Sequence, residues 1–246
     1  METLDSIKIR DLEVQVYQSK TGYRFSLDAL LLADFPEIRT CKSILELGAG
    51  SGVVSLLLAK RYPKARVTGV EIQEGLYSRA VRNAEVNGLS GRVEFLHMDL
   101  KQLPKKLPHE GFEMVVMNPP FRVPGTGKIS PGDERAMARH EITAGIKDVL
   151  RVSSVMLKNR GRLCLVYLPD RLAELVRLMH TYSLEPKRVR TVHSHKGDEA
   201  KMLLIEAVKH GAPGLKILPP LFVYESHKVY TSEMRQFYGF PPLPRG

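Results

Sequence analysis

From residue 43 onward, short apolar runs alternate with longer segments of helical periodicity, and this alternation restricts the fold more than any other feature. Strands that alternate with helices of about 10–15 residues are typical of a mostly parallel sheet with helices on both faces. We therefore expect an α/β fold built on a seven-stranded, mostly parallel sheet. The expected strands are 43–47, 66–70, 93–97, 113–117, 161–168, 188–194 and 201–209, the last two forming a hairpin-like pair across HKGDE. The expected helices are 53–61, 74–87, 144–158 and 171–182.

Two flanking segments lie outside this alternation. Residues 7–18 alternate polar and apolar side chains, as in a half-buried hairpin. Ser26 stands before the next apolar run, where a helix N-cap is favoured, and Pro36 follows its end. The tail beyond 210 is rich in Pro and Tyr and is expected to wrap the surface. The predicted parts are an N-terminal hairpin and capping helix (1–40), a main domain (41–210) and a C-terminal extension packed on it (211–246).

Composition narrows the class of protein and its partners. A chain of 246 residues with 43% hydrophobic content can bury one sizeable core. The net charge of +10 suggests a polyanionic partner, with nucleic acid ahead of an anionic membrane. The N-terminus has no apolar core of signal-peptide length, and no apolar run approaches the roughly 18 residues of a spanning helix. These features predict a cytoplasmic protein without membrane association.

Cysteine and histidine usage gives little support for a metal site. The two cysteines, Cys41 and Cys164, form no CxxC pair, so neither a zinc site nor a disulfide framework is indicated. His193 and His195 lie two residues apart on an expected strand, but no third ligand is evident nearby. The sequence therefore predicts no metal.

The stretch ELGAGSG follows the first expected strand and carries Gly48, Gly50 and Gly52. A dinucleotide-binding fingerprint would need its third glycine at position 53, and a P-loop would need GKS or GKT, so both are excluded. Glycines after a strand still indicate close approach of a ligand to the backbone. Glu71 ends the second strand, where a carboxylate can accept both hydroxyls of a ribose, and Asp99 follows the third, where one can accept an exocyclic amine. Together these features predict a pocket for an adenosine.

These residues resemble the class I S-adenosylmethionine-dependent methyltransferases, with ILELGAGSG, VTGVEI and FLHMDL as the first three motifs. The resemblance covers about residues 44–206. It implies a Rossmann-like methyltransferase domain with S-adenosyl-L-methionine as cofactor. In that arrangement the glycine loop and Glu46 hold the methionine end, Glu71 the ribose and Asp99 the adenine edge. The resemblance also implies cofactor contacts from Ile72, on the adenine face, and from Leu100 and Asn118.

The stretch MVVMNPPFR places a rigid corner at the end of the fourth expected strand. Asn118 precedes a proline, which restricts it to extended conformations, and Pro119 and Pro120 remove two backbone donors. An acceptor-rich edge therefore stands beside the ring of Phe121, and this combination suits a planar –NH2 group. Acceptors that hold both hydrogens of such an amine make its nitrogen more nucleophilic. The corner thus predicts catalysis by orientation and polarisation, without a strong base.

The corner also resembles the (D/N/S)PP(Y/F) motif of amino-methyltransferases, which implies that Asn118, Pro119 and Phe121 are catalytic. In the wider group this motif serves adenine N6, cytosine N4, guanine N2 and the glutamine amide, so it leaves the acceptor open. Ribosomal guanine N2 enzymes often read NPPFH, whereas Arg122 follows here. Protein glutamine methyltransferases carry a helical N-terminal domain, and only residues 1–42 precede the first strand here. Ribosomal guanine N2 and a protein glutamine side chain stay as alternatives.

The stretch GYRFSLDALLLADF, residues 22–35, is similar to bacterial tRNA adenine N6-methyltransferases that act beside the anticodon of a valine tRNA. The resemblance implies methylation of adenine N6 in tRNA, and it places Phe25 and Asp28 beside the cofactor. The alternative for Asp28 is a first-turn carboxylate favoured by the helix dipole.

Two basic segments are candidates for contact with RNA. The loop at 122–140 is long and basic, and it either contacts RNA or is a solvated loop. The second segment is the basic edge near His193 and His195. The candidate residues are Arg122, Lys128, Arg135 and Arg139 in the loop, and Arg188 and Arg190 at the edge.

Overall fold

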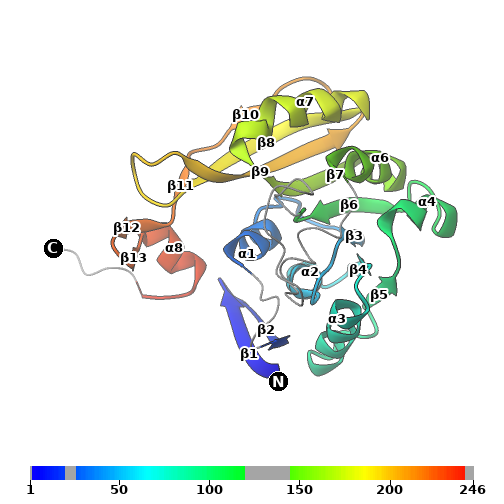
Figure 1. Ribbon diagram of the computed structural model, residues 1–246, viewed down its shortest axis with the longest axis horizontal. Coiled ribbons are helices and arrows are strands. Elements are labelled where there is room, and N and C mark those ends of the chain that lie inside the picture. The colour runs from blue at the N-terminus through cyan, green and yellow to red at the C-terminus, as the bar shows by residue number, and fades with distance from the viewer. Residues whose placement is uncertain (1, 20–25, 120–144, 242–246) are drawn as a thin grey trace, which may run out of the picture.

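The computed structural model describes residues 2–19, 26–119 and 145–241, and its centre is one mixed sheet (Figure 1). The strand order is β10-β8-β9-β7-β6-β3-β4-β5, and β11 also pairs with β8. β3 to β7 run parallel to one another, and β9 lies antiparallel between β7 and β8. The strands are β3 (Ser43–Leu47), β4 (Arg66–Glu71), β5 (Val93–His97), β6 (Phe112–Met117), β7 (Leu157–Tyr167), β8 (Leu184–His193), β9 (Ala200–Lys209), β10 (Lys216–Ile217) and β11 (Leu221–Phe222). The seven predicted strands and the β8–β9 pair are confirmed, and β10 and β11 are short additions at the edge.

Helices cover both faces of the sheet. Neighbouring residues of β3 show why, since Ile44 packs with one apolar cluster and Leu45 with the other. The first cluster contains α1 (Leu27–Asp34), α2 (Val53–Arg61) and α3 (Glu74–Val86). The second contains α4 (Leu103–Lys106), α6 (Ile146–Met156) and α7 (Leu172–Thr181). The short 3-10 helices η1 (Leu100–Gln102) and η2 (Pro169–Arg171) precede α4 and α7.

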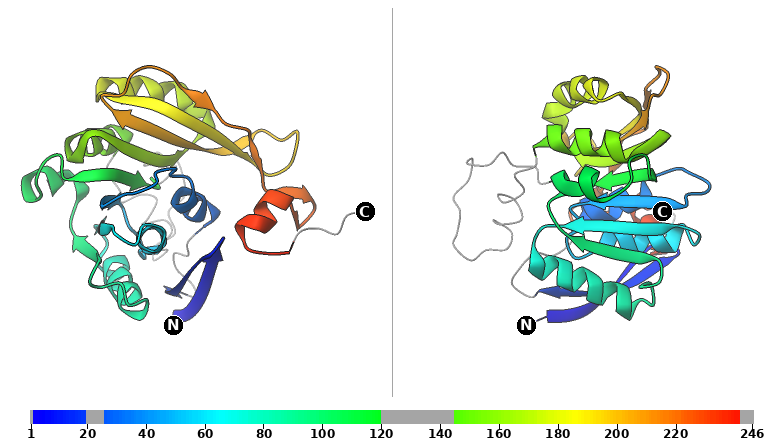
Figure 2. Two further views of the ribbon diagram at one scale, coloured as in Figure 1. Left: turned by 180° about the vertical axis from the view of Figure 1, so that it is seen from behind. Right: turned by 90° about the vertical axis from the view of Figure 1, so that its right-hand side faces the viewer.

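The two flanking segments pack on the first of these clusters. The hairpin of β1 (Glu2–Ile9) and β2 (Leu12–Ser19) adds its apolar side chains to that cluster. The C-terminal extension adds Met234 and Phe237 from α8 (Ser232–Phe237), which follows the pair β12 (Tyr224–Ser226) and β13 (Val229–Tyr230). Figure 2 shows the hairpin and this extension side by side, and the Arg10 N–H donates to the Phe237 carbonyl over 2.6 Å. The division at 40 and 210 stays a prediction.

Several element boundaries differ from the sequence-based expectation, and the largest differences lie at the starts of β7 and β8. The helix expected to reach 158 ends at Met156, because Leu157 already pairs with Phe112 in extended conformation. A bulge follows, with Arg160 at a φ of 64°. β8 begins before Pro186 rather than after it, and the ladder absorbs the proline with a register shift. α4, a single turn that starts at Leu103, was not predicted. No helix in the described ranges is long and apolar enough to span a membrane.

Candidate functional site: a ligand pocket at the carboxyl edge of the sheet

The four loops singled out in the sequence lie at the carboxyl ends of β3, β4, β5 and β6, which are adjacent in the sheet (Figure 1). Ligands of open α/β sheets bind at this edge. A cavity of about 30 Å³ opens there between the glycine loop, α1 and the end of β6. It is lined by Ala29, Glu46, Gly48, Ala49, Ser51, Val53, Val54 and Asn118. The structure thus brings three of the predicted site residues, Glu46, Gly48 and Asn118, around one space.

The glycine loop adopts a backbone that only glycine forms easily. Gly48, Gly50 and Gly52 have φ values of 71°, 57° and 84°. Gly52 is required for a second reason, because a Cβ there would lie 2.7 Å from Cζ of Phe95. The Gly52 N–H bonds to the Ala49 carbonyl over 2.8 Å, so the chain turns tightly into α2. The loop therefore presents its backbone at the strand end, as the sequence predicts.

Glu46 lies beneath this loop and is only 2% exposed. Its Oε2 accepts hydrogen bonds from the backbone N–H of Ser55, over 2.8 Å, and from the Ser55 hydroxyl. Burial raises the pKa of the Glu46 carboxyl to about 8, the Glu71 charge acts in the same direction, and the Ser55 bonds oppose both. The carboxyl thus fixes the first turn of α2, and contact with a methionine group stays a prediction.

Glu71 joins the end of β4 to the glycine loop. One carboxylate oxygen accepts the Gly50 N–H over 2.7 Å, and the other accepts the Gln73 N–H over 2.9 Å. Burial raises the pKa of Glu71, and the backbone hydrogen bonds work against this rise. Ile72 stands next to it with 41% of its surface exposed, so its apolar side chain is accessible beside the carboxylate. An apolar surface beside a fixed carboxylate matches the predicted pocket for a base and its ribose.

Asp99 follows β5 and caps η1, its Oδ1 accepting the Lys101 N–H over 2.9 Å. Its second oxygen lies 3.5 Å from the Lys101 ammonium, and the side chain is partly exposed. Asp99 is therefore the N-cap of η1. Leu100 is buried in the second apolar cluster. Contact of either residue with an adenine stays a prediction.

Asn118 is among the described residues with a buried polar side-chain atom that the fold does not pair. Its Oδ1 is buried, and it has no hydrogen-bond partner in the described part of the chain. A buried acceptor of this kind costs about 1–3 kcal/mol when unpaired, so natural proteins rarely keep one without a role. Pro119 beside it is buried. Phe121, the third predicted catalytic residue, lies outside the described residues.

Asp28 lies in the first turn of α1 and is 8% exposed. Its Oδ1 accepts the Ala29 N–H over 3.0 Å and the hydroxyl of Ser26, the N-cap residue. Ser26 thus occupies the predicted N-cap position, but it bonds to Asp28 rather than to the helix backbone. The first-turn alternative for Asp28 fits this geometry, and its neighbour Ala29 lines the cavity. Phe25 lies outside the described residues.

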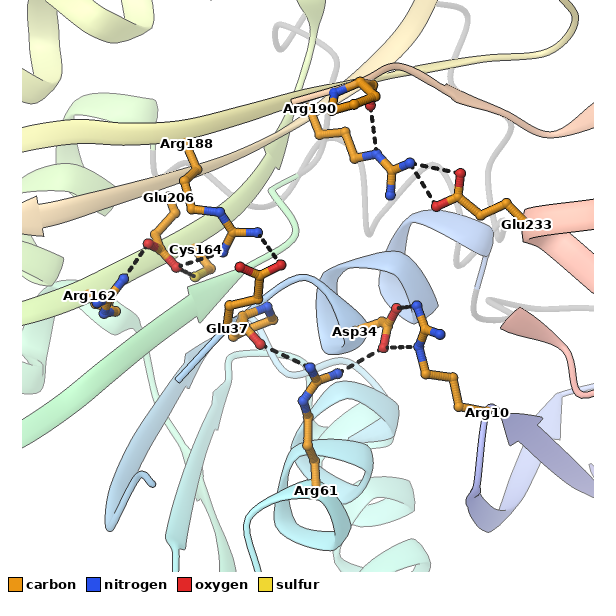
Figure 3. Close-up of polar contacts among 12 residues, drawn as sticks. Arg10, Asp34, Glu37, Arg61, Arg162, Cys164, Arg188, Arg190, Glu206 and Glu233 are labelled. Carbon is orange, nitrogen blue, oxygen red and sulfur yellow. Dashed lines mark hydrogen bonds and ion pairs between the residues drawn. The ribbon is translucent and has the colours of Figure 1, made fainter. Parts of the chain in front are cut away.

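The two arginines predicted at the RNA-facing edge are engaged by carboxylates of the same chain (Figure 3). Arg188 is 12% exposed and lies between Glu37, at 3.0 Å, and the buried Glu206, at 3.5 Å. Arg190 donates to both oxygens of Glu233 over 2.7 and 2.9 Å. Their contact with RNA stays a prediction that now competes with an internal role. The loop residues Arg122, Lys128, Arg135 and Arg139 lie outside the described residues.

The histidines of this edge have protein partners as well. His193 bonds to the Asp198 carbonyl over 2.8 Å and to the Thr191 hydroxyl over 2.9 Å. His195 lies 3.2 Å from the Asp198 carboxylate. Over ranges 2–19, 26–119 and 145–241, no three His, Cys, Asp or Glu side chains gather as a metal site would require.

Sequence reasoning missed Asn83, which is fully buried on α3. Its Nδ2 donates to the Ser51 carbonyl of the glycine loop over 2.9 Å, and its Oδ1 accepts the Tyr17 N–H of β2 over 2.7 Å. Asn is disfavoured inside helices, because its amide competes for backbone groups. A signal was available: Asn83 and Asn87 stand four residues apart on one face of the expected helix.

The residues at this edge fit S-adenosylmethionine on their own chemistry. The loop of three left-handed glycines leaves its backbone open to a ligand. Glu71 and exposed Ile72 supply a carboxylate and an apolar surface side by side. Asn118 supplies a buried acceptor, and this residue lines the same cavity as the glycine loop. A ligand with a ribose, a planar base and an amino acid end suits all three groups.

Comparison with known proteins agrees with this assignment. A family model for the methyltransferase small domain matches residues 26–170. A protein of Porphyromonas gingivalis named tRNA1(Val) (adenine(37)-N6)-methyltransferase is 32% identical over 79% of this chain and 78% of its own. A protein of the same name from Flavobacterium johnsoniae is 25% identical over 90% of this chain and 93% of its own. A solved structure from Agrobacterium tumefaciens, described as a predicted O-methyltransferase, superimposes with a TM-score of 0.68 at 26% identity, covering 87% of this chain and 96% of that one. The chain therefore belongs to the methyltransferase small domain family, in which its relatives include tRNA1(Val) (adenine(37)-N6)-methyltransferases.

Proposed function

We propose that this methyltransferase transfers a methyl group from S-adenosylmethionine to the N6 amine of an adenine in tRNA. The observation that carries the proposal is the buried Oδ1 of Asn118, which has no hydrogen-bond partner among the described residues and belongs to a residue that lines the glycine-loop cavity. An acceptor without a hydrogen to receive is suited to a ligand that brings one, and an exocyclic amine does so. The named relatives support adenine and tRNA as the acceptor.

Four groups of residues would hold the cofactor, which when bound supplies the methyl group of its sulfonium. Glu71 would accept the ribose hydroxyls, because its carboxylate is fixed at the end of β4. Ile72 would cover one face of the adenine. The backbone of the loop 48–52 would lie against the amino acid end, with Glu46 beneath it.

Asn118 would act on the target amine by orientation and polarisation. Its Oδ1 would accept one amine hydrogen, which draws the nitrogen lone pair away from conjugation with the ring. Pro119 would restrict the Asn118 backbone to extended conformations, which limits the positions that the acceptor can take. Holding the nitrogen in line for transfer supplies much of the rate advantage in such reactions. Phe121 is predicted to complete this arrangement by stacking on the target adenine.

Transfer RNA as the substrate agrees with the charge of the chain. The net charge of +10 favours a polyanion, and RNA-modifying enzymes of this kind need the target base splayed from its neighbours. A tRNA substrate also implies a cytoplasmic enzyme, which we include in the proposal.

The test is transfer of labelled methyl from S-adenosylmethionine to bulk bacterial RNA, followed by nucleoside analysis of the product. Wild type and Asn118→Ala would be compared at equal, folded concentration, with Asn118→Asp as the variant that keeps an acceptor oxygen. We expect N6-methyladenosine in tRNA from wild type, a loss of about 100-fold or more in Asn118→Ala, and partial activity in Asn118→Asp.

Other methylated products would mean that the enzyme uses a different acceptor. Methylated guanine in ribosomal RNA, or label in protein instead of RNA, would replace adenine by one of the two alternatives and keep the site. Full activity in Asn118→Ala would remove the proposed role of this residue.

A further inference from the structure

Two asparagines, Asn83 in α3 and Asn87 at the C-cap of that helix, hold the hairpin β1–β2 by its backbone. Asn83 pairs with Tyr17, accepting its N–H over 2.7 Å and donating to its carbonyl over 3.4 Å. Asn87 pairs with Gln15 in the same way, over 2.9 and 2.7 Å. The two side chains therefore complete the outer edge of β2 as a neighbouring strand would.

Asn83 differs from Asn87 in one contact. Its Nδ2 also donates to the carbonyl of Ser51, over 2.9 Å, inside the glycine loop. Asn87 uses its remaining contact on the carbonyl of Asn83, over 2.7 Å, and so stays within α3. Asn83 thus joins the hairpin to the glycine loop, whereas Asn87 joins the hairpin only to α3.

The glycine loop is held from two sides at adjacent residues. Glu71 accepts the Gly50 N–H from the strand side, and Asn83 donates to the Ser51 carbonyl from the helix side. Because Asn83 is fully buried, water cannot replace its amide without a rearrangement. A loop of left-handed glycines has many other conformations available, so these two bonds help to select the one seen here.

We propose that Asn83 is a positioning residue that couples the docking of the hairpin to the affinity of the glycine loop for the cofactor. This proposal rests on the proposed function in one respect, the binding of S-adenosylmethionine at this loop. The hairpin would then stabilise the binding conformation of the loop through Asn83, although neither Tyr17 nor Asn83 contacts the reacting atoms.

The experiment measures binding of S-adenosylhomocysteine by calorimetry to wild type, Asn83→Ala and Asn87→Ala. The two variants each remove one pair of hairpin bonds, so Asn87→Ala is the matched control. We expect the dissociation constant to rise about 10-fold or more in Asn83→Ala and to stay within about 2-fold in Asn87→Ala. In turnover, the KM for S-adenosylmethionine should rise in Asn83→Ala while kcat changes little, a split that simple loss of folded protein does not produce.

A second measurement keeps the proposal testable if Asn83→Ala fails to fold. Hydrogen exchange of the wild-type full chain, with and without S-adenosylhomocysteine, reports the same coupling in reverse, because linkage between two sites is reciprocal. We expect the ligand to slow exchange of the Tyr17 amide about 10-fold more than exchange of the Gln15 amide. Equal protection of the two amides, or equal weakening by the two variants, would overturn the role of Asn83. Absence of binding to wild type would instead reject the proposed cofactor.

Discussion

Glu71 and Gly50 are joined by a hydrogen bond of 2.7 Å between a carboxylate oxygen and a backbone N–H. The bond connects the end of β4 to the glycine loop that follows β3, so two sequence motifs meet at one contact. The other Glu71 oxygen is held by the Gln73 N–H over 2.9 Å. Each oxygen keeps a second lone pair, so the carboxylate can fix the loop and still accept ribose hydroxyls.

Glu71→Ala is expected to weaken cofactor binding by about 100-fold or more. The substitution leaves the Gly50 and Gln73 N–H groups without their acceptor and removes the predicted ribose contact, and hydrogen bonds to a charged group contribute about 1.5–3 kcal/mol each. Calorimetry with S-adenosylhomocysteine measures the change. Glu74→Gln is the control, because this exposed acid lies in the first turn of α3, away from the loop. Equal affinities in the two variants would contradict the role of Glu71.

Glu46 makes the stability of the ligand-free protein depend on pH in a particular direction. Burial raises its pKa from 4.5 to about 8, so between these values the folded protein holds a proton that the unfolded chain has released. The free energy of unfolding should therefore fall as pH rises from about 5 to about 8, by up to about 1.4 kcal/mol per pH unit from this group. Glu46→Gln removes the ionisation and keeps an acceptor for Ser55.

The comparison of Glu46→Gln with wild type isolates this effect from the other titrating groups. Urea unfolding at several pH values should show the variant gaining stability relative to wild type as pH rises. A constant difference across this range would mean that the fold does not raise the pKa of Glu46. The opposite trend, seen below about pH 5, would mean that its hydrogen bonds outweigh its burial and lower the pKa.

Gly52→Ala is expected to destabilise the protein more than Gly88→Ala. Both glycines have positive φ, 84° and 64°, and a left-handed residue with a Cβ costs about 1–2 kcal/mol. Only at Gly52 would the added Cβ meet a neighbour, Cζ of Phe95 at 2.7 Å, whereas at Gly88 nothing lies within 4 Å. Overpacking adds about 1–3 kcal/mol. Urea unfolding of both variants checks the ranking, and equal losses would show that Phe95 moves aside freely.

The sheet was predictable from the sequence because its strands carry strong local signals. The strands at 43–47 and 93–97 and the helix at 53–61 have the predicted bounds, since apolar runs there end at glycine, polar or charged residues. The start of β7 was missed because the bulge at Arg160 depends on pairing with β6, a long-range contact. Pro186 concealed the start of β8 for the same reason, because the ladder tolerates it only through a register shift.

The site was predictable where one residue has one chemical task, and less so where several residues share a hydrogen bond network. Asn118 and the glycines follow from backbone geometry that the sequence states directly. The spacing of Asn83 and Asn87 is visible in the sequence, but the role of Asn83 depends on Tyr17 and Ser51, which come from two distant segments that only the fold brings together. Arg190 looked available to RNA because its carboxylate partner lies in the C-terminal extension.

Arg190 provides the last prediction, because its guanidinium pairs with both oxygens of Glu233 and with the Pro219 carbonyl (Figure 3). If this internal role is the main one, Arg190→Ala and Glu233→Ala should each lower the free energy of unfolding by up to about 1 kcal/mol. The double variant should lose less than the sum of the two, because the partners are in contact. Affinity for tRNA should stay within about 2-fold in both single variants.

If Arg190 binds RNA instead, its removal should weaken tRNA binding and reduce the salt dependence of that binding. Glu233→Ala should then strengthen binding by freeing the guanidinium. Opposite shifts of affinity in the two variants would thus restore the RNA contact predicted from the sequence.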